Sequence, residues 1–262
     1  MIEQVTNVVW IGFAASVVAS LGTALGSLGV FVVRSLSAKL EDVLLSLAAG
    51  VMLAAALFSL LLPAIDYAEQ QFGSRELAVV VACCGLMLGA VMLFVIHRLS
   101  PHEHFVVGVE GPRAAHLGRI WLFVIAITLH NFPEGLAVGV GFAGGDIRNG
   151  VSLMAGIGLQ NIPEGLAVSI SLLTVGYTRL QAFTVGLLSG LVEPVGGLVG
   201  SVAVSFAAAA IPWALAMAAG AMLFVISDEI IPETHRRGFE NIATFALLAG
   251  FSLMMYLDAV LG

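Results

Sequence analysis

Eight apolar stretches run along the chain, and each approaches the length that crosses a membrane. Their ranges are about 8–33, 41–63, 76–97, 119–142, 150–174, 182–206, 211–230 and 241–261. About 20 apolar residues span a hydrocarbon core of roughly 30 Å as one helix. Because short loops separate most stretches, the pattern predicts one all-α domain, residues 1–262, built as a bundle of eight transmembrane helices.

The composition agrees with a lipid environment. Hydrophobic residues make up 60% of the chain and charged residues 10%, and the mean hydropathy is +1.06. Soluble domains carry about 25% charged residues, so this chain cannot cover a water-facing surface. The opening residues MIEQVTNVVW lack the basic region of a secretory signal, so the first stretch is expected to be retained as a helix.

Basic residues predict the orientation in the membrane. With the N-terminus outside, eight of the ten Lys and Arg residues fall on the cytoplasmic side, and only Arg75 and Arg148 lie outside. An excess of Lys and Arg marks cytoplasmic loops. We therefore expect an inner-membrane protein with both termini extracytoplasmic and a cytoplasmic, histidine-containing loop at about 98–118. The net charge of -7 without a basic patch argues against a nucleic-acid partner.

A ten-residue motif occurs twice, 30 residues apart, in neighbouring predicted helices. Residues 129–138 read LHNFPEGLAV and residues 159–168 read LQNIPEGLAV. Neighbouring spans run in opposite directions, and inverted repeats of this kind hold substrate near the membrane midplane. Seven polar residues are predicted at one depth, namely His130, Asn131, Glu134, Gln160, Asn161, Glu164 and, on the sixth helix, Glu193.

Three carboxylates at the midplane require positive charge. An ionised side chain at the bilayer centre costs at least about 2.5 kcal/mol, and no Lys or Arg occupies the central turns of any predicted helix. A bound cation is the simplest source. His130 and Glu134 are one helical turn apart, and imidazole with carboxylate favours zinc, iron, manganese, cobalt or cadmium. Met52, central in the second predicted helix, offers a thioether, although most membrane methionines pack.

Simpler interpretations exist for single residues. A lone membrane His or Glu can bond a neighbouring helix, whereas a duplicated set at one depth favours a functional site. Cys83 and Cys84 are expected to pack against helices as small apolar residues. Asp66 and Asp146 are either cation-attracting groups at the outer side or ordinary solvated charges. His97 lies beside the long loop.

The motifs HNFPEGLAVG and QNIPEGLAV, followed by Glu193-Pro194, resemble the fourth-to-sixth-helix signature of the ZIP (Zrt/Irt-like) metal transporters. The resemblance covers essentially the whole chain and is greatest to the bacterial branch with a binuclear metal centre. It includes AAGVMLAAALFSLLLP around Met52 and SDEIIPETHRRG near the C-terminus. It implies transport of divalent metal into the cytoplasm by movement of one helix group against another.

The same resemblance implies the ligands. One metal position would use Met52, His130, Glu134, Gln160 and Glu164, and the other Asn131, Glu134, Asn161, Glu164 and Glu193, with the two repeat glutamates bridging. Metal would leave through His102, His104, Asp228 and Glu229. Many relatives carry His at position 160 and some carry Asp at 161, so the neutral Gln160 and Asn161 predict a weaker second site. They make a divalent transition metal a firmer prediction than zinc.

The expected function is therefore transport of divalent transition-metal ions, with zinc first and cadmium, iron, manganese or cobalt as alternatives. The metal is substrate rather than cofactor, no residue is assigned a catalytic role, and the sequence leaves open whether the chain forms a homodimer. One rival is a proton-coupled carrier of another solute. A second is an intramembrane metalloenzyme, although the chain lacks HExxH and a separate general base.

Overall fold

The computed structural model describes residues 2–99, 102–104, 108–110, 119–174 and 176–261. Its α-helices are α1 (Ile2–Leu28), α2 (Ala38–Ala54), α3 (Leu62–Phe72), α4 (Arg75–Leu99), α5 (Arg119–Gly141), α6 (Ile147–Thr174), α7 (Arg179–Gly190), α8 (Val192–Phe206), α9 (Ile211–Val225), α10 (Ile231–Thr234) and α11 (Glu240–Leu261). Short 3-10 turns are η1 (Gly29–Phe31), η3 (Ala143–Gly145) and η4 (Ala208–Ala210), and π-helical turns are η2 (Ala55–Leu61) and η5 (Ile226–Ile230).

The all-α prediction is confirmed, and within the described residues one short hairpin accompanies the helices. β1 (His102–His104) and β2 (Gly108–Glu110) pair as an antiparallel hairpin in which residue 103 faces residue 109. The hairpin occupies part of the stretch predicted as a plain loop at 98–118, and β1 lies beside α5. The bundle itself is helical, as the apolar pattern predicts.

One predicted helix end is wrong. The stretch 41–63 was expected to stop at Pro63, but α2, η2 and α3 form one continuous rod from Ala38 to Phe72. Pro63 falls in the first turn of α3, where a missing N–H does no harm. The rod ends at Gly73, whose φ of 70° is the left-handed conformation that closes many helices.

Six helical segments within the described ranges are long and apolar enough to cross a membrane. They are Asn7–Phe31, Ala38–Phe72, Arg75–Leu99, Arg179–Ser205, Ala208–Thr234 and Glu240–Leu261. α5 and α6, which carry the polar motif, fall outside this set, yet their 23 and 28 residues also suffice in length. Large apolar side chains such as Leu25, Met87 and Phe245 are exposed on the outer helices. These features describe a multi-pass membrane protein.

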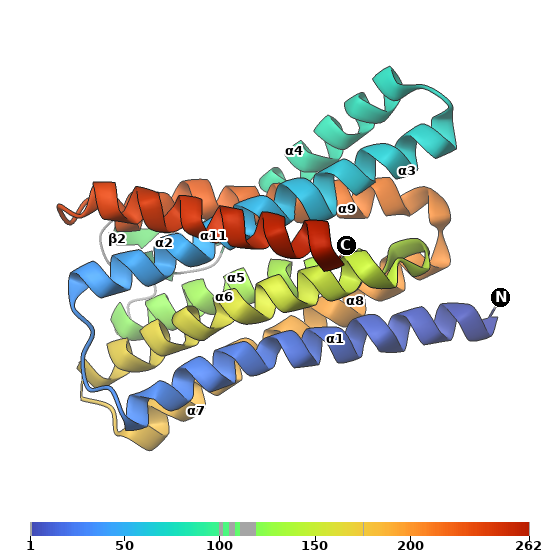
Figure 1. The fold of residues 1–262 in the computed structure, drawn as a ribbon. Coiled ribbons are helices and arrows are strands. Elements are labelled where there is room, and N and C mark those ends of the chain that lie inside the picture. The colour runs from blue at the N-terminus through green and yellow to red at the C-terminus, as the bar shows by residue number, and fades with distance from the viewer. Residues whose placement is uncertain (1, 100–101, 105–107, 111–118, 175, 262) are drawn as a thin grey trace.

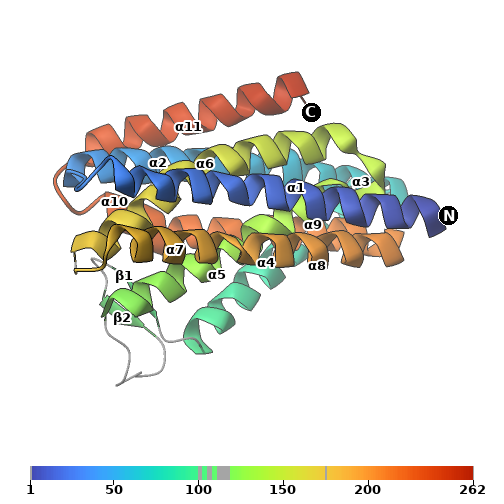
Figure 2. The same cartoon turned by 90° about the horizontal axis from the view of Figure 1, so that it is seen from below.

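The long helices divide into two groups by their packing (Figure 1). In the first group, α1 packs along α6 and α8, and α5 packs along α8. In the second group, α2 packs along α11, and α4 packs along α9. In Figure 1, α5 and α6 lie between α2, α9 and α11 above and α1 and α7 below, and Figure 2 shows the hairpin beside the start of α5. The interface between the groups is formed largely by α6 against α2 and α5 against α9.

The cysteines lie where the sequence did not predict them. Cys83 and Cys84 are exposed on α4 rather than packed against a helix. Glycines make that helix contact instead, since a Cβ at Gly89 would overlap the carbonyl oxygen of Met217 on α9. The close approach of α4 to α9 therefore turns the cysteines to the outer face.

Candidate metal centre

Both copies of the repeated motif lie inside continuous helices. Pro133 is within α5 and Pro163 is within α6. The glycine of each motif permits close backbone contact. A Cβ at Gly135 would overlap the carbonyl oxygen of Glu193, and one at Gly165 would overlap that of Thr23. Because these two glycines have no Cβ, the start of α8 and the middle of α1 can pack close to the polar residues of α5 and α6.

Glu193 lies at a break between two helices. α7 ends at Gly190 and α8 begins at Val192, and Pro194 has no N–H to continue the hydrogen bonding. The Glu193 carboxylate is fully buried and accepts two hydrogen bonds, from Thr23 Oγ1 at 3.1 Å and from Asn161 Nδ2 at 2.8 Å. The carboxylate is therefore held in place from α1 and α6.

Glu134 and Gln160 connect the two motif copies. Gln160 Nε2 donates to Glu134 Oε1 at 2.6 Å, and both side chains are fully buried. Glu134 also interacts electrostatically with Glu164 and Glu193. The carboxylates predicted to share one site are therefore neighbours in the structure.

Three buried oxygens of this site accept no hydrogen bond from the described residues. They are Glu134 Oε2, Gln160 Oε1 and Asn161 Oδ1. An unsatisfied buried acceptor costs about 1–3 kcal/mol, so most buried acceptors have a donor. Carboxylate and amide oxygens with free lone pairs are suitable ligands for a divalent cation. The donor set therefore fits a metal substrate.

His130 faces a second cluster, formed with helices outside the repeat. Its Nε2 lies 2.6 Å from Glu229 Oε1, and His97 Nδ1 lies 3.2 Å from the same oxygen. One ligand atom from each of these three buried residues lies within 4.8 Å of the other two. Two imidazoles and a carboxylate form a typical set for zinc and other transition metals. We name His97, His130 and Glu229 the imidazole cluster.

His97 is a candidate ligand that the sequence prediction missed, because its position suggested loop chemistry. It belongs to the last turn of α4 and is buried. The available signal was helical spacing, since Gly85, Gly89, Leu93 and His97 recur at intervals of four residues and all lie on the buried face of α4.

A π-helical turn separates the roles of Asp228 and Glu229. In a regular α-helix the ring of Pro232 would clash with the carbonyl of Asp228, and the wider η5 turn covers this position. Glu229 points inward and is buried, whereas Asp228 is exposed. The structure therefore brings one of the two predicted exit residues to His130 and leaves the other on the outside of the cluster.

Glu164 lies between the two sets of ligands. It is buried and interacts electrostatically with His130 and Glu229 as well as with Glu134. Asn131 has a different role, since its Nδ2 donates to the carbonyl oxygen of Ser189 at 2.9 Å and ties α5 to α7.

The remaining predicted ligands are Met52 and two histidines of the predicted loop, His102 and His104. Met52 is buried in the main apolar cluster, which agrees with packing as well as with a ligand role. His102 and His104 belong to β1, but their side chains lie outside the described part of the structure.

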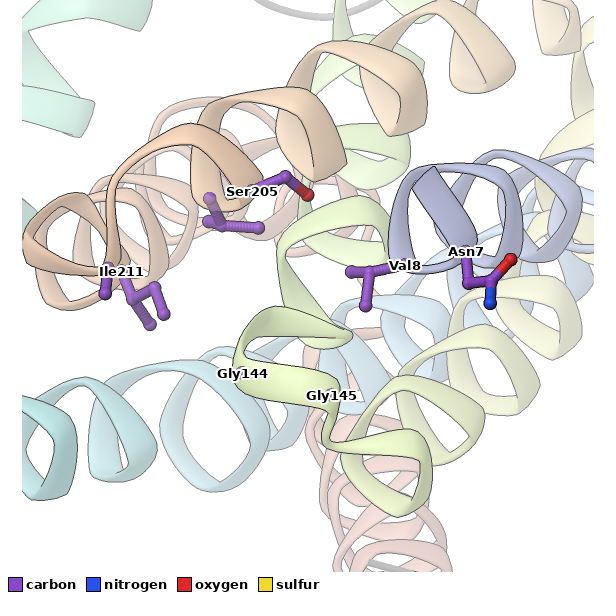
Figure 3. Close-up of a pocket in the computed structure, with 8 residues that line it drawn as sticks. Asn7, Val8, Gly144, Gly145, Ser205 and Ile211 are labelled. Atoms are coloured by element: carbon purple, nitrogen blue, oxygen red, sulfur yellow. The ribbon is translucent and has the colours of Figure 1, made fainter. Parts of the chain in front are cut away.

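The acidic residues at the other end of the bundle have structural partners. Asp66 pairs with Arg75 at 2.8 Å, and Asp146 Oδ1 accepts from the backbone N of Asn149 at 3.1 Å. At this end a cavity of about 450 Å³ opens, and Figure 3 shows its lining by Asn7, Val8, Gly144, Gly145, Ser205 and Ile211. Among the described residues that line this cavity, none is a predicted metal ligand.

Long apolar helices around buried carboxylate, amide and imidazole groups define a multi-pass membrane protein with a polar site inside its bundle. The chain belongs to the ZIP family, since the family model described as ZIP Zinc transporter matches residues 107–258. Proteins of this family are transporters, so the chain is not an enzyme.

Similar proteins extend this match over almost the whole chain. The zinc transporter ZIPB of Bordetella bronchiseptica is 47% identical over 96% of this chain and 79% of the relative. The zinc transporter GufA of Myxococcus xanthus is 46% identical over 96% of this chain and 99% of the relative. The human zinc transporter ZIP11 is 35% identical over 92% of this chain and 94% of the relative.

Proposed function

We propose that this chain transports divalent transition-metal ions, zinc first, across the bacterial inner membrane into the cytoplasm. The relatives are named zinc transporters, and the buried donors are oxygen and imidazole groups of the kind that bind such metals. Cadmium, iron, manganese and cobalt are the further candidate substrates.

The position of His130 is the observation that supports this proposal most strongly. It belongs to the repeated motif, yet its Nε2 lies 2.6 Å from Glu229 on the opposite group of helices. The ligands of the repeat are therefore continuous with the imidazole cluster, which includes the last turn of α4. A metal ion can pass from oxygen ligands to imidazole ligands without entering an apolar region.

The proposed path has two successive stations. The first is a binuclear position inferred from the family signature, held by Met52, His130, Asn131, Glu134, Gln160, Asn161, Glu164 and Glu193. The second is the imidazole cluster, which Glu164 connects to the first through its interactions with His130 and Glu229. Metal enters the first station from the outer side and leaves from the second toward the cytoplasm.

The division of ligands between helix groups supports a movement of one group against the other. His130, Glu134 and Glu164 belong to the first group, whereas His97 and Glu229 belong to the second. A relative shift of the groups would separate His130 from Glu229. The two stations would then be connected in one state and disconnected in the other, which is the requirement for alternating access.

The distribution of basic residues supports eight spans with both termini outside. The connections that follow α1 and α10 lie on the left of Figure 1, where α7 also begins, and these places hold Arg34, Arg236 and Arg179. Arg75 and Arg148 belong to the opposite end, where α4 and α6 begin. Basic residues mark the cytoplasmic side, so the left of Figure 1 is assigned to the cytoplasm.

Uptake of labelled zinc and cadmium into proteoliposomes tests the function. The wild type should accumulate metal, and the triple variant His130→Ala, Glu134→Ala, Glu164→Ala should not. Equal uptake by the two proteins would refute the site. Metal-independent, pH-driven uptake of another solute by metal-free protein would instead favour the proton-coupled carrier.

A further inference from the structure

Four charged side chains meet at the end of the bundle assigned to the cytoplasm. The Arg237 guanidinium lies 2.8 Å from Glu41 Oε2 and 2.8 Å from Glu233 Oε1, and Asp42 Oδ1 lies 3.5 Å from Arg237 Nη1. We name Glu41, Asp42, Glu233 and Arg237 the Arg237 cluster. His235 is the other ionisable group that acts on Asp42. Three carboxylates surround one guanidinium, so the cluster retains negative charge.

The guanidinium is a permanent cation in this cluster. Burial lowers the pKa of Arg237, but the carboxylates of Glu41 and Glu233 outweigh burial and raise the pKa above its ordinary value. An arginine does not lose its proton in proteins. The guanidinium of Arg237 therefore always provides one positive charge, covalently attached to the chain, beside these carboxylates.

Asp42 has more bonding capacity than its neighbours use. Its side chain is fully buried, and neither carboxylate oxygen accepts a hydrogen bond from the described residues. Ser46, one turn later on α2, is buried and its Oγ also has no hydrogen-bond partner among them. Asp42 Oδ1 lies 3.5 Å from Arg237 Nη1, so the carboxylate faces the cluster. Unsatisfied buried oxygens of this kind are suited to a cation.

The ligand-bearing face of α6 leads to this cluster. The positions Gln160, Glu164, Ala167, Ser171 and Thr174 recur at alternating intervals of four and three residues, which places them along one face of the helix. The last three of them line a cavity of about 170 Å³ that Glu41 and Arg237 also line. The Arg237 cluster therefore borders a cavity that is also lined by the face of α6 that carries Gln160 and Glu164.

We propose that the Arg237 cluster is a divalent-cation site in which the tethered guanidinium takes the place of the metal. The inference rests on the proposed transport function. Arg237 neutralises part of the carboxylate charge. Metal that leaves the imidazole cluster therefore passes the cytoplasmic end of the bundle without being bound by the Arg237 cluster. Removal of the guanidinium leaves the carboxylates of Glu41, Asp42 and Glu233 as oxygen ligands for a metal ion.

Metal content of purified protein in nanodiscs tests the site. The Arg237→Gln variant, equilibrated with buffered Zn²⁺ or Cd²⁺, should hold one more metal ion per chain than the wild type. Metal should also raise its melting temperature more than that of the wild type, because binding to the folded state alone stabilises it. Adding Asp42→Asn to Arg237→Gln should abolish both gains.

Two further variants keep the test decisive. Arg236→Gln removes the exposed neighbouring arginine and should leave the metal count unchanged. Arg237→Lys keeps the positive charge but loses the forked guanidinium donor group. It should bind the extra metal ion only at a higher concentration of free metal than Arg237→Gln requires. If Arg237→Gln does not fold, Arg237→Lys provides the test. Equal metal content of wild type and both Arg237 variants would overturn the proposal, as would extra metal that persists without Asp42.

The measurement separates this inference from the transport function. All the compared variants share an intact first station and imidazole cluster, so an unchanged metal count would refute the role of Arg237 and leave wild-type uptake standing. Absence of metal uptake by the wild type would refute the transport function, whatever the metal count of the variants.

Discussion

The two copies of the motif have nearly the same sequence and quite different surroundings. On α5, His130 reaches out of the repeat to Glu229 of the second helix group. On α6, Gln160 at the matching position reaches back into the repeat and donates to Glu134. The asparagines differ as well, since Asn131 bonds a backbone carbonyl and Asn161 bonds the Glu193 carboxylate. Duplication supplies matching residues, and the neighbouring helices decide what each does.

The comparison predicts the largest effect at Glu134, which joins the two copies. Glu134→Gln preserves shape and removes a charge at the centre of the first station, so zinc uptake should fall about 100-fold or more, since even outer-shell partners of metal ligands contribute about 10–100-fold. Glu69→Gln, at an exposed carboxylate paired with Arg75, is the control and should transport normally. Near-normal uptake by Glu134→Gln would show that the copies do not share this ligand.

Exchange of the two differing residues tests whether the copies are interchangeable. The double variant His130→Gln, Gln160→His has the same composition as the wild type, but its imidazole would face Glu134 instead of Glu229. We expect a loss of about 10–100-fold in uptake, comparable with His130→Gln alone. Restoration of wild-type uptake by the exchange would contradict the distinct roles.

The asparagine of α6 offers a smaller effect with a characteristic rescue. Asn161→Asp places a second carboxylate where Asn161 now donates to Glu193 at 2.8 Å, so metal-free protein should lose about 2 kcal/mol of stability. Zinc should restore it, since a cation satisfies both carboxylates. Thermal unfolding with and without zinc measures this.

Asn149→Asp is the matched control for that experiment, because Asn149 is also a buried amide of α6 but bonds the backbone carbonyls of Ser59 and Gly141. Zinc should not rescue its stability. Equal rescue of the two variants would argue against a metal beside Asn161.

Thr23 should give the smallest effect. Its hydroxyl donates to Glu193 at 3.1 Å, and Thr23→Val should weaken zinc binding by about fivefold, the equivalent of a hydrogen bond of about 1 kcal/mol. Thr184→Val, at an exposed threonine that bonds its own helix, should leave the dissociation constant unchanged in the same binding assay. Identical affinities for the two variants would show that orientation of Glu193 from α1 is unimportant.

Several features of the fold were predictable because they depend on local patterns. Apolar length predicted the helices, and the repeated motif together with Glu193 predicted a shared polar site. In the structure Gln160 bonds Glu134 and Asn161 bonds Glu193, while the ligand roles of these residues stay a prediction. Pro63 misled the prediction of one helix end, because a π-helical turn before it lets the rod continue to Phe72. Such a turn depends on packing as well as on the proline.

The sequence by itself determined that this chain resides in lipid and that it carries carboxylate, amide and imidazole groups where lipid excludes them, since length, hydropathy and helical spacing are local properties. Only the tertiary structure decided which of those groups meet. His97 and Glu229 are far from His130 in the chain, and the contact among them depends on how α4, α5 and η5 pack across two helix groups. The same holds for Asp42 and Arg237, because no sequence pattern encodes an approach between residues so distant along the chain.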